Sequence, residues 1–296
     1  MSERLLTLIG LLASAMPILA QDTPPTVVNT GKIEYSPYPE QNFPNSVYFG
    51  DTHLHTSYSP DAGMAGTTIG PDQAYRFAKG EPVVSSTGIP ARLGRPLDFL
   101  VIADHAENLG LPIAIREQDE SLMATQWGQE MSALFAQGTQ DSARAAIDKY
   151  QTVLNALVDP LKGTTFGQAA WERIIKAAEE HNTPGSFTAF IGFEWSPAPG
   201  GNYLHRVIVF RDGADRALQV FPVSAYDTED PERVWGWMEA YENSTGGRVL
   251  AIPHNGNLSN GLMFDDVTLT DKKPLDAEYA RRRMRFEPLY EVTQTK

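Results

Sequence analysis

The chain has 296 residues, with 42% hydrophobic and 21% charged side chains, which is enough apolar material for a sizeable core in one large domain or two small ones. Its formal net charge of −13 argues against a nucleic-acid duplex as the primary partner, because clustered Lys and Arg drive that binding. There are no cysteines, so disulfides, thiolate metal ligands and cysteine nucleophiles are excluded. Any metal site must therefore use His, Asp and Glu.

The amino terminus has the pattern of an export signal. Residues 5–20 form an apolar run that ends in small residues, which predicts a signal peptide over residues 1–20 with cleavage after Ala20. A transmembrane anchor is the alternative, but the run contains Ser14 and Pro17 and is shorter than the roughly 20 residues needed to span a bilayer. We expect an exported, periplasmic protein with no stable membrane anchor after cleavage.

A leader rich in Pro, Asn and Ser follows over residues 21–45, and the predicted globular part covers 46–296. The predicted elements are strand 47–55, helix 71–80, hairpin 81–94, strand 97–105, helices within 113–181, strands 187–196 and 203–210, helix 230–244, strand 248–257, helix 276–287 and strand 288–294. This alternation indicates an α/β architecture with a mostly parallel sheet or barrel. The stretch 111–182 is longer than a barrel crossover and predicts a helical insertion, either a lid or a subdomain.

Chemically useful side chains gather at the ends of the predicted strands. They are His53, His55, Asp104, His105, Glu194, His205 and His254. In parallel α/β barrels the rim at the carboxyl ends of the strands holds the active site. The remaining histidine, His181, ends a helical run, where a cation suits the helix dipole, so we expect a structural or solvated role for it.

His53 and His55 point to the same side of their strand, because side chains alternate with a period of two. Two adjacent imidazoles gain little in a core and repel each other when both are protonated. A divalent metal resolves both problems, since neutral imidazole is its commonest nitrogen ligand. A chance pair on the surface is the alternative.

Three other groups each allow two interpretations. Asp104 is part of the site or caps the next helix. Glu194 ends a very apolar strand, so it bridges two metals or forms half of a buried ion pair. His254 is a ligand or a satisfied core histidine. Taken together, imidazoles and carboxylates without thiolates suit Zn, Mn or Fe, and two ions that share a carboxylate activate water for hydrolysis.

Three further polar residues are candidates for substrate binding. Asn202 and Asn255 lie in predicted loops near the rim, where capping of the loop is the alternative. Arg206 follows His205 and points to the opposite face if the strand is regular, so its alternative role is structural.

The stretches GDTHLHTSYSPDA, FLVIADHAE, GFEWS, NYLHRVIVF and IPHNGN resemble, in order and spacing, the motifs of the PHP superfamily (polymerase and histidinol phosphatase). The nearest branch is the one known as domain of unknown function 3604, and the resemblance covers roughly residues 46–296. It implies a distorted (β/α)7 barrel of the TIM-like type, with a di- or trinuclear metal centre at its carboxyl rim. Many members of the superfamily hydrolyse phosphoesters.

The resemblance also implies a set of metal ligands. His53 and His55 would hold one ion, and Glu194 would bridge to a second ion held also by His205 and His254. This arrangement makes Glu194 a catalytic carboxylate as well as a ligand.

A third ion would be held by His105, and Asp61 stands where the family often has a further His. Asp104, the other predicted catalytic carboxylate, would orient a ligand or a water. The last motif of the family, an Asp-x-His, is absent, because no histidine follows His254. We therefore expect a truncated barrel that lacks its final strands.

These features predict an exported, metal-dependent hydrolase with two or three divalent ions (Zn, Mn or Fe). Its expected partner is a small-molecule substrate, a phosphoester, attacked by metal-activated water. One alternative is an amidohydrolase-like enzyme that acts on a non-phosphate bond, since one fold supports several chemistries. The other is an inactive, truncated metal-binding barrel.

Overall fold

The structure is a computed structural model that describes residues 46–292 and 294. The chain divides into two units, Met1–Val47 and Tyr48–Lys296, and the description below concerns the second. The predicted signal peptide over 1–20 and the leader over 21–45 lie outside the described residues. Among the helices that are described, none has the length and apolar character required to cross a lipid bilayer.

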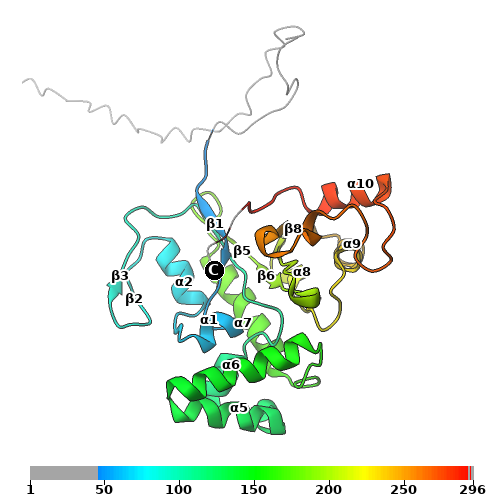
Figure 1. Cartoon of the computed structure of the whole chain (residues 1–296). Helices are drawn as coiled ribbons and strands as arrows, with labels where there is room; N and C mark the ends of the chain where they lie inside the picture. Colours follow the sequence, from blue (N-terminus) through cyan, green and yellow to red (C-terminus); the bar gives the residue numbers. More distant parts are fainter. Residues whose placement is uncertain (1–45, 293, 295–296) are drawn as a thin grey trace, which may run out of the picture. The chain divides into compact units, whose positions relative to one another are not determined.

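The second unit is a mixed α/β structure, as predicted from the alternation of elements (Figure 1). Its strands are β1 (Gly50–Leu54), β2 (Val83–Val84), β3 (Pro90–Ala91), β4 (Phe99–Ile102), β5 (Thr188–Phe190), β6 (Gly192–Trp195), β7 (Arg206–Phe210) and β8 (Val249–Pro253). Its helices are α1 (Pro60–Met64), α2 (Pro71–Ala78), α3 (Leu111–Glu117), α4 (Glu120–Met123), α5 (Gln126–Gln137), α6 (Gln140–Asn155), α7 (Phe166–His181), α8 (Ala214–Ala217), α9 (Pro231–Thr245) and α10 (Ala277–Phe286). Three short 3-10 turns are η1 (Pro199–Gly201), η2 (Gly256–Leu258) and η3 (Leu262–Phe264).

Several local predictions are confirmed. Helix α2 begins at Pro71, whose missing N–H costs nothing in a first helical turn. Strands β2 and β3 form the predicted hairpin, with Val83 paired to Ala91. The Asp230 side chain caps α9 by accepting a hydrogen bond of 2.9 Å from the Glu232 N–H.

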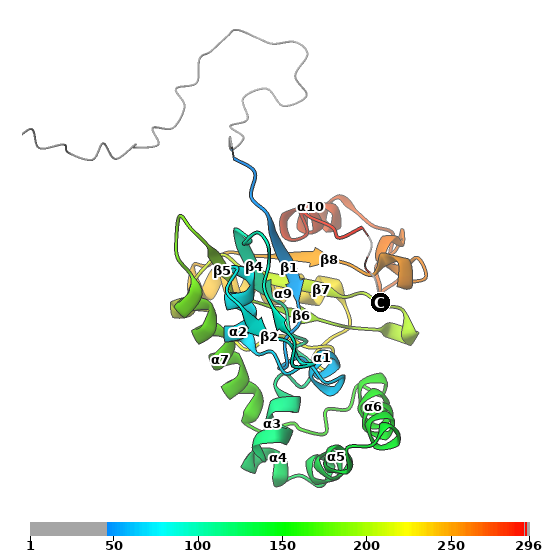
Figure 2. The ribbon, with the colours of Figure 1, turned by 90° about the vertical axis from the view of Figure 1, so that its left-hand side faces the viewer.

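Two three-stranded sheets form the centre of the unit (Figure 2). The sheet β1-β4-β5 is parallel, as expected, but the sheet β6-β7-β8 is antiparallel. The prediction of a mostly parallel sheet is therefore wrong for the second half of the chain. The reason is the short link over 196–205, because parallel neighbours need a crossover of about a dozen residues or more.

The two sheets meet where β6 follows β5. Gly192 is needed at this junction, because a Cβ there would lie 2.5 Å from a methyl carbon of Val101 and 2.8 Å from the Ile208 carbonyl oxygen. An isolated parallel bridge between His105 and Glu194 continues the contact beyond the end of β4. The ends of β4 and β6 are thereby held side by side.

The described strands do not close into a barrel, so the expected (β/α)7 barrel is not confirmed. Residues 288–292 form no strand, although a strand was predicted there. Pro288 has no N–H to donate, and one hydrogen bond of 3.0 Å, from the Glu291 N–H to the Pro253 carbonyl, ties this segment to β8. An apolar cavity of about 680 Å³ remains between the two sheets, with Phe99 of β4 and Leu250 of β8 among its lining residues.

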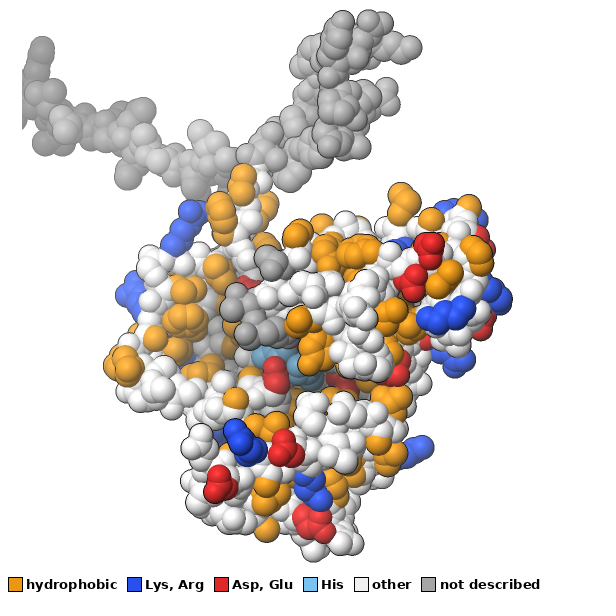
Figure 3. All heavy atoms as spheres, viewed as in Figure 1, with side chains coloured by type: hydrophobic (Ala, Val, Ile, Leu, Met, Phe, Trp, Pro, Cys, Tyr) orange, Lys and Arg blue, Asp and Glu red, His pale blue; other side chains and the backbone are white. Residues whose placement is uncertain are grey.

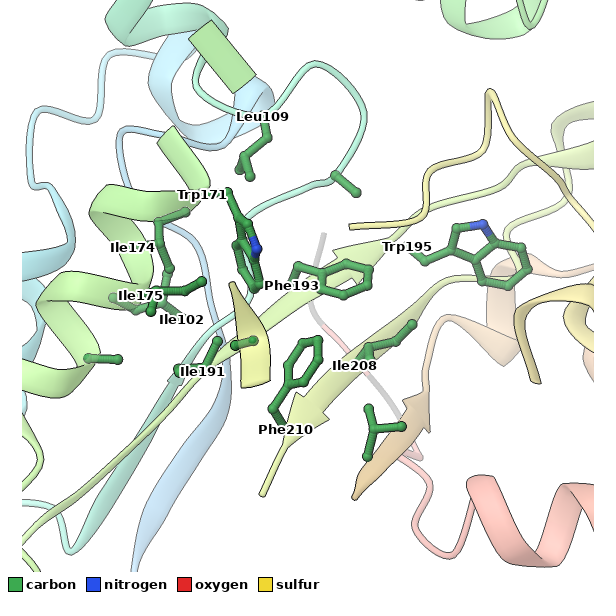
Figure 4. Packing of buried hydrophobic residues seen from close by; sticks show 14 of the residues in the cluster. Ile102, Leu109, Trp171, Ile174, Ile175, Ile191, Phe193, Trp195, Ile208 and Phe210 are labelled. Carbon is green, nitrogen blue, oxygen red and sulfur yellow. The ribbon is translucent and has the colours of Figure 1, made fainter. Parts of the chain in front are cut away.

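The main core packs α2, α7 and α9 against the strands. Figure 4 shows Trp171 of α7 beside Phe193 and Phe210, and its ring centroid lies 6.0 Å and 5.9 Å from theirs. A separate cluster packs the four helices α3, α4, α5 and α6 together through buried side chains such as Leu122 and Met131. Figures 1 and 2 show α5 and α6 together at the end of the unit away from the strands. The helices of the predicted insertion thus divide. Most of α7 packs in the main core, while α3–α6 pack in a second core that also includes Met64 of α1 and Phe166 of α7.

Candidate metal centre

The structure brings the predicted ligand residues together at one edge of the two sheets. His53 lies in β1 and His55 directly follows it, His105 follows β4, Glu194 lies in β6, His205 precedes β7 and His254 follows β8. His205 was predicted inside the strand 203–210, but β7 begins only at Arg206, so His205 precedes the strand. It reaches the same edge because β7 runs antiparallel to its neighbours, so its amino end lies beside the carboxyl ends of β6 and β8.

Glu194 is at the centre of the cluster, with a carboxylate that has no exposure to solvent. Its Oε1 lies 2.6 Å from His205 Nδ1 and 2.8 Å from His254 Nε2. Its Oε2 lies 3.2 Å from His53 Nε2 and 2.7 Å from His55 Nε2. Oε2 also lies 3.7 Å from His105 Nδ1, so each oxygen of one carboxylate faces at least two imidazoles, as in a carboxylate that could bridge two metal ions.

A second group extends toward the surface. The Asp61 carboxylate lies 3.0 Å from His55 Nδ1 and 3.4 Å from His105 Nε2, and half of its side chain is exposed. The other ring nitrogen of His105 contacts the hydroxyl of Ser196. Figure 3 shows histidine side chains at one place on this face of the molecule, next to an acidic side chain.

The two ends of the cluster differ in protonation. Burial lowers the pKa of His205 to about 4 and also lowers the pKa of His254, so both rings stay neutral near pH 7. Burial acts in the same direction on His55, but its hydrogen bonding to Asp61 and the charge of Glu194 outweigh that effect and raise its pKa to about 10. The pKa of His105 is raised in the same way.

The pKa values of the carboxylates Glu194 and Asp61 are lowered. Burial favours the protonated form of Glu194, but the charge of His105 and the hydrogen bonds from His205 and His254 hold its pKa well below its usual range. Hydrogen bonds from His105 and His55 likewise lower the pKa of Asp61 against the effect of burial. Both carboxylates are therefore ionised at neutral pH, which is the form that binds a cation.

The donor atoms fit divalent metal ions. Four groups have ligand atoms within 4.8 Å of one another: His53, His55 and Glu194; Glu194, His205 and His254; His55, Asp61 and His105; and His53, His254 and Glu291. Within the described residues, His55 Nε2 is buried without a hydrogen-bond partner, although it lies 2.7 Å from a Glu194 oxygen. A metal ion beside that nitrogen would satisfy it, and a set of nitrogen and oxygen donors suits Zn, Mn or Fe.

Asp104 does not face the histidine ligand atoms. Its Oδ1 accepts the Thr56 N–H at 2.5 Å, and its Oδ2 accepts the Thr56 hydroxyl at 2.7 Å. Burial raises the pKa of Asp104 to about 6, against the lowering effect of these hydrogen bonds. The structure therefore shows Asp104 as an anchor of the backbone that directly follows His55.

The structure separates the three candidates for substrate binding. Arg206 is buried away from the cluster, with its Nε 3.1 Å from Glu287 Oε1. The Asn202 side chain donates to the Pro199 carbonyl at 2.9 Å, which is the capping role given above as the alternative. Only Asn255 lies at the cluster, where its Nδ2 is 3.4 Å from His205 Nδ1 and its Oδ1 is buried without a partner among the described residues.

His181, the histidine outside the cluster, is buried, and its Nε2 lies 2.9 Å from Asp72 Oδ1. This contact agrees with the structural role expected from its position at the end of a helix.

Glu291 is the residue at the cluster that was not predicted. Its Oε2 lies 2.8 Å from His53 Nδ1. The signal in the sequence was an acidic residue within a late apolar stretch, PLYEVTQ, in a chain whose other strand ends carry ligands. That signal is weak, because the contact between Glu291 and His53 depends on the path of the segment after α10, which no local pattern predicts.

Comparison with known proteins gives a family and no characterised relative. Neither a search of curated proteins nor a search of solved structures finds a match. Residues 42–296 match a family described as protein of unknown function (DUF3604). Since the match spans more than half of the chain, the chain belongs to the DUF3604 family.

Proposed function

We propose that this protein is a metal-dependent hydrolase that acts on phosphoesters. The observation that carries the proposal is the Glu194 carboxylate, which is fully buried and faces two imidazoles with each oxygen. A buried carboxylate with only imidazole neighbours is costly unless a cation is bound nearby or the rings are protonated. His205 and His254, the two rings that face Oε1, stay neutral, so a bound cation is the better explanation for that side of the carboxylate.

The geometry supports two ion positions, one on each side of Glu194. His53 Nε2, His55 Nε2 and Glu194 Oε2 would hold the first, and Glu194 Oε1, His205 Nδ1 and His254 Nε2 would hold the second. Three protein ligands for each ion leave coordination positions open to water and substrate. Bound there, two ions supply an activated water and charge neutralisation at phosphorus.

The protonation states of His205, His254 and Glu194 are those that metal binding requires. Burial keeps His205 and His254 neutral, so each presents a lone pair. Ionised Glu194 supplies the negative charge between the two ion positions. Asp61 and His105 would form a third position nearer the surface, since half of the Asp61 side chain is exposed.

Several finer points belong to the same proposal. The motif order and the placement of the predicted ligands at one sheet edge support membership in the PHP superfamily, although the described strands do not close into the barrel of that superfamily. Export to a periplasm rests on residues 1–20 of the sequence. A negative net charge is compatible with a phosphoester substrate, because bound metal ions dominate the local field.

The experiment is a metal analysis joined to an activity assay of the purified full chain. Mono- and bis-p-nitrophenyl phosphate, p-nitrophenyl acetate and a p-nitroanilide are offered with added Mn or Zn. The test variant is His254→Gln, and the matched control is His181→Gln, a buried histidine outside the cluster.

We expect stoichiometric metal and phosphoester turnover, both lost in His254→Gln and kept in His181→Gln. Turnover of the acetate or anilide alone would favour the amidohydrolase-like alternative. Bound metal without turnover of any of the four substrates would favour the alternative of an inactive metal-binding barrel. Absence of metal from the wild-type protein would reject the centre altogether.

A further inference from the structure

Glu291 contacts both β8 and β1, the last and the first of the described strands. Its N–H donates to the carbonyl of Pro253, the last residue of β8, at 3.0 Å. Its carboxylate reaches His53 on β1, with Oε2 2.8 Å from the ring Nδ1. One residue thus links the strand before His254 to the strand that carries His53.

The two ring nitrogens of His53 have different neighbours. Nε2 lies 3.2 Å from Glu194 Oε2, and Nδ1 faces Glu291. A neutral imidazole carries one N–H, so donation from Nδ1 to Glu291 leaves the lone pair on Nε2. That lone pair points to the side of Glu194 where the first ion position lies.

We propose that Glu291 is a positioning residue, which holds His53 in the Nδ1–H tautomer and fixes its ring for metal binding through Nε2. A carboxylate on the outer nitrogen of a metal-bound histidine both orients the ring and makes it a stronger ligand. The inference rests on the proposed metal centre and adds to it a residue that is not itself a ligand.

Direct ligation by Glu291 is the competing explanation, since His53, His254 and Glu291 have ligand atoms within 4.8 Å of one another. An ion there would compete for nitrogens that already face Glu194. His53 would have to offer Nδ1 while Nε2 faces Oε2, and His254 Nε2 lies 2.8 Å from Oε1. A neutral imidazole offers one lone pair, so the first ion position excludes this use of His53.

His254 gives a comparison within the same cluster. Its outer nitrogen, Nδ1, lies 3.3 Å from the carbonyl oxygen of Ile252, a neutral acceptor. His53 has a carboxylate in the equivalent role. A charged acceptor forms the stronger hydrogen bond, so loss of Glu291 should weaken the ion at His53 more than the ion at His254.

The test is a zinc titration of the full chain, freed of metal, against a chromophoric chelator. The variants are Glu291→Ala and Glu291→Gln, with Glu278→Ala as control, since Glu278 is an exposed carboxylate paired with Arg281. We expect Glu291→Ala to weaken one zinc ion by about 10–100-fold with an unchanged number of ions, the usual effect of losing an outer carboxylate. Glu291→Gln should lose less, because its amide oxygen still accepts, and Glu278→Ala should match the wild type.

A double-mutant cycle with His53→Ala shows whether Glu291 acts through His53. In the His53→Ala background, Glu291→Ala should cause no further loss of zinc affinity, because the partner is gone. The melting temperature of each metal-free variant separates a folding defect from a binding defect. If Glu291→Ala does not fold, the same titrations and cycle are made with Glu291→Gln.

Three results would overturn the inference while leaving the metal centre intact: unchanged affinity in both Glu291 variants, additive losses in the cycle, or one fewer ion in Glu291→Ala. The last would make Glu291 a direct ligand. Failure of the wild-type protein to bind zinc would instead reject the proposed function and the inference together.

Discussion

Two parts of the cluster contain the same kinds of side chain in different surroundings. The buried trio consists of Glu194, His205 and His254, and the outer trio consists of His55, Asp61 and His105. In the buried trio both histidines have lowered pKa values, whereas in the outer trio both have raised ones. The comparison teaches that burial and neighbouring charge, rather than residue type, decide how strongly protons compete with a metal ion.

The largest effect should come from Glu194→Gln, which removes the charge shared by both proposed ions. We expect the affinity for both ions to fall by more than the roughly 100-fold upper value for losing an outer partner. Metal content after gel filtration measures this, with Glu130→Gln, an exposed residue of α5, as the control. Retention of both ions by Glu194→Gln would remove the basis for treating the buried trio as a ligand set.

Arg206→Met should damage the fold without touching either trio. Arg206 and Glu287 form a buried ion pair, and Glu287 also accepts the Trp235 Nε1–H at 2.8 Å. Glu287 keeps a second partner, Arg283, whose Nε lies 3.2 Å from Oε2. Loss of Arg206 should therefore lower the free energy of unfolding by less than the roughly 3–5 kcal/mol expected for a buried charge left unpaired. Urea denaturation measures the loss, and unchanged metal content in the folded variant would separate this region from the site. Loss of metal with unchanged stability would instead place Arg206 in the site.

Lowering the pH should first weaken the two ion positions that use His55 or His105, namely the one beside Glu194 Oε2 and the one at Asp61. These two histidines have raised pKa values, so metal binding must displace their protons. Affinity there should fall by about tenfold per pH unit for each proton displaced. Because the pKa of His205 is lowered to about 4, the buried trio should keep its ion to about pH 5. Calorimetric zinc titrations between pH 8 and pH 5, in buffers of different ionisation enthalpy, measure both the affinity and the protons released.

The smallest effect should come from Asp61→Asn. Its carboxylate is half-exposed, so solvent screens its charge, and it lies 3.4 Å from His105 Nε2. We expect about a tenfold loss at a single, weaker ion position, with the ions beside Glu194 retained. The pKa of His55 should also fall, since its hydrogen bond to the Asp61 carboxylate is one cause of its rise. Histidine NMR titrations of the metal-free variant would show this, and an unchanged His55 titration would contradict the stated cause.

The sequence predicted the members of the cluster well for a simple physical reason. Strand ends can be found from apolar runs, and polar groups placed at several strand ends meet at one edge of a sheet. His53, His55 and His254 lie where that argument places them. The common side of His53 and His55 follows directly from the period of a strand.

The sequence did not reveal the direction of β7 or the contacts between residues that are far apart in the chain. The direction of β7 is set by the length of its link to β6. It brings the start of β7, with His205 just before it, to the edge where β6 and β8 end, although only carboxyl ends of strands were expected there. Arg206 and Glu287 are 81 positions apart, so no local pattern reveals their pairing. Glu291 meets His53 across an even longer separation, through a segment whose predicted strand is absent from the described residues.

The central claim is that Glu194 bridges two divalent ions, and one measurement tests it most directly. Crystals of the zinc-loaded protein would be measured on both sides of the zinc absorption edge, and the anomalous difference map would locate the ions. The account predicts two peaks about 3.5–4 Å apart, one beside each oxygen of Glu194. One peak alone, or peaks that do not contact this carboxylate, would contradict it.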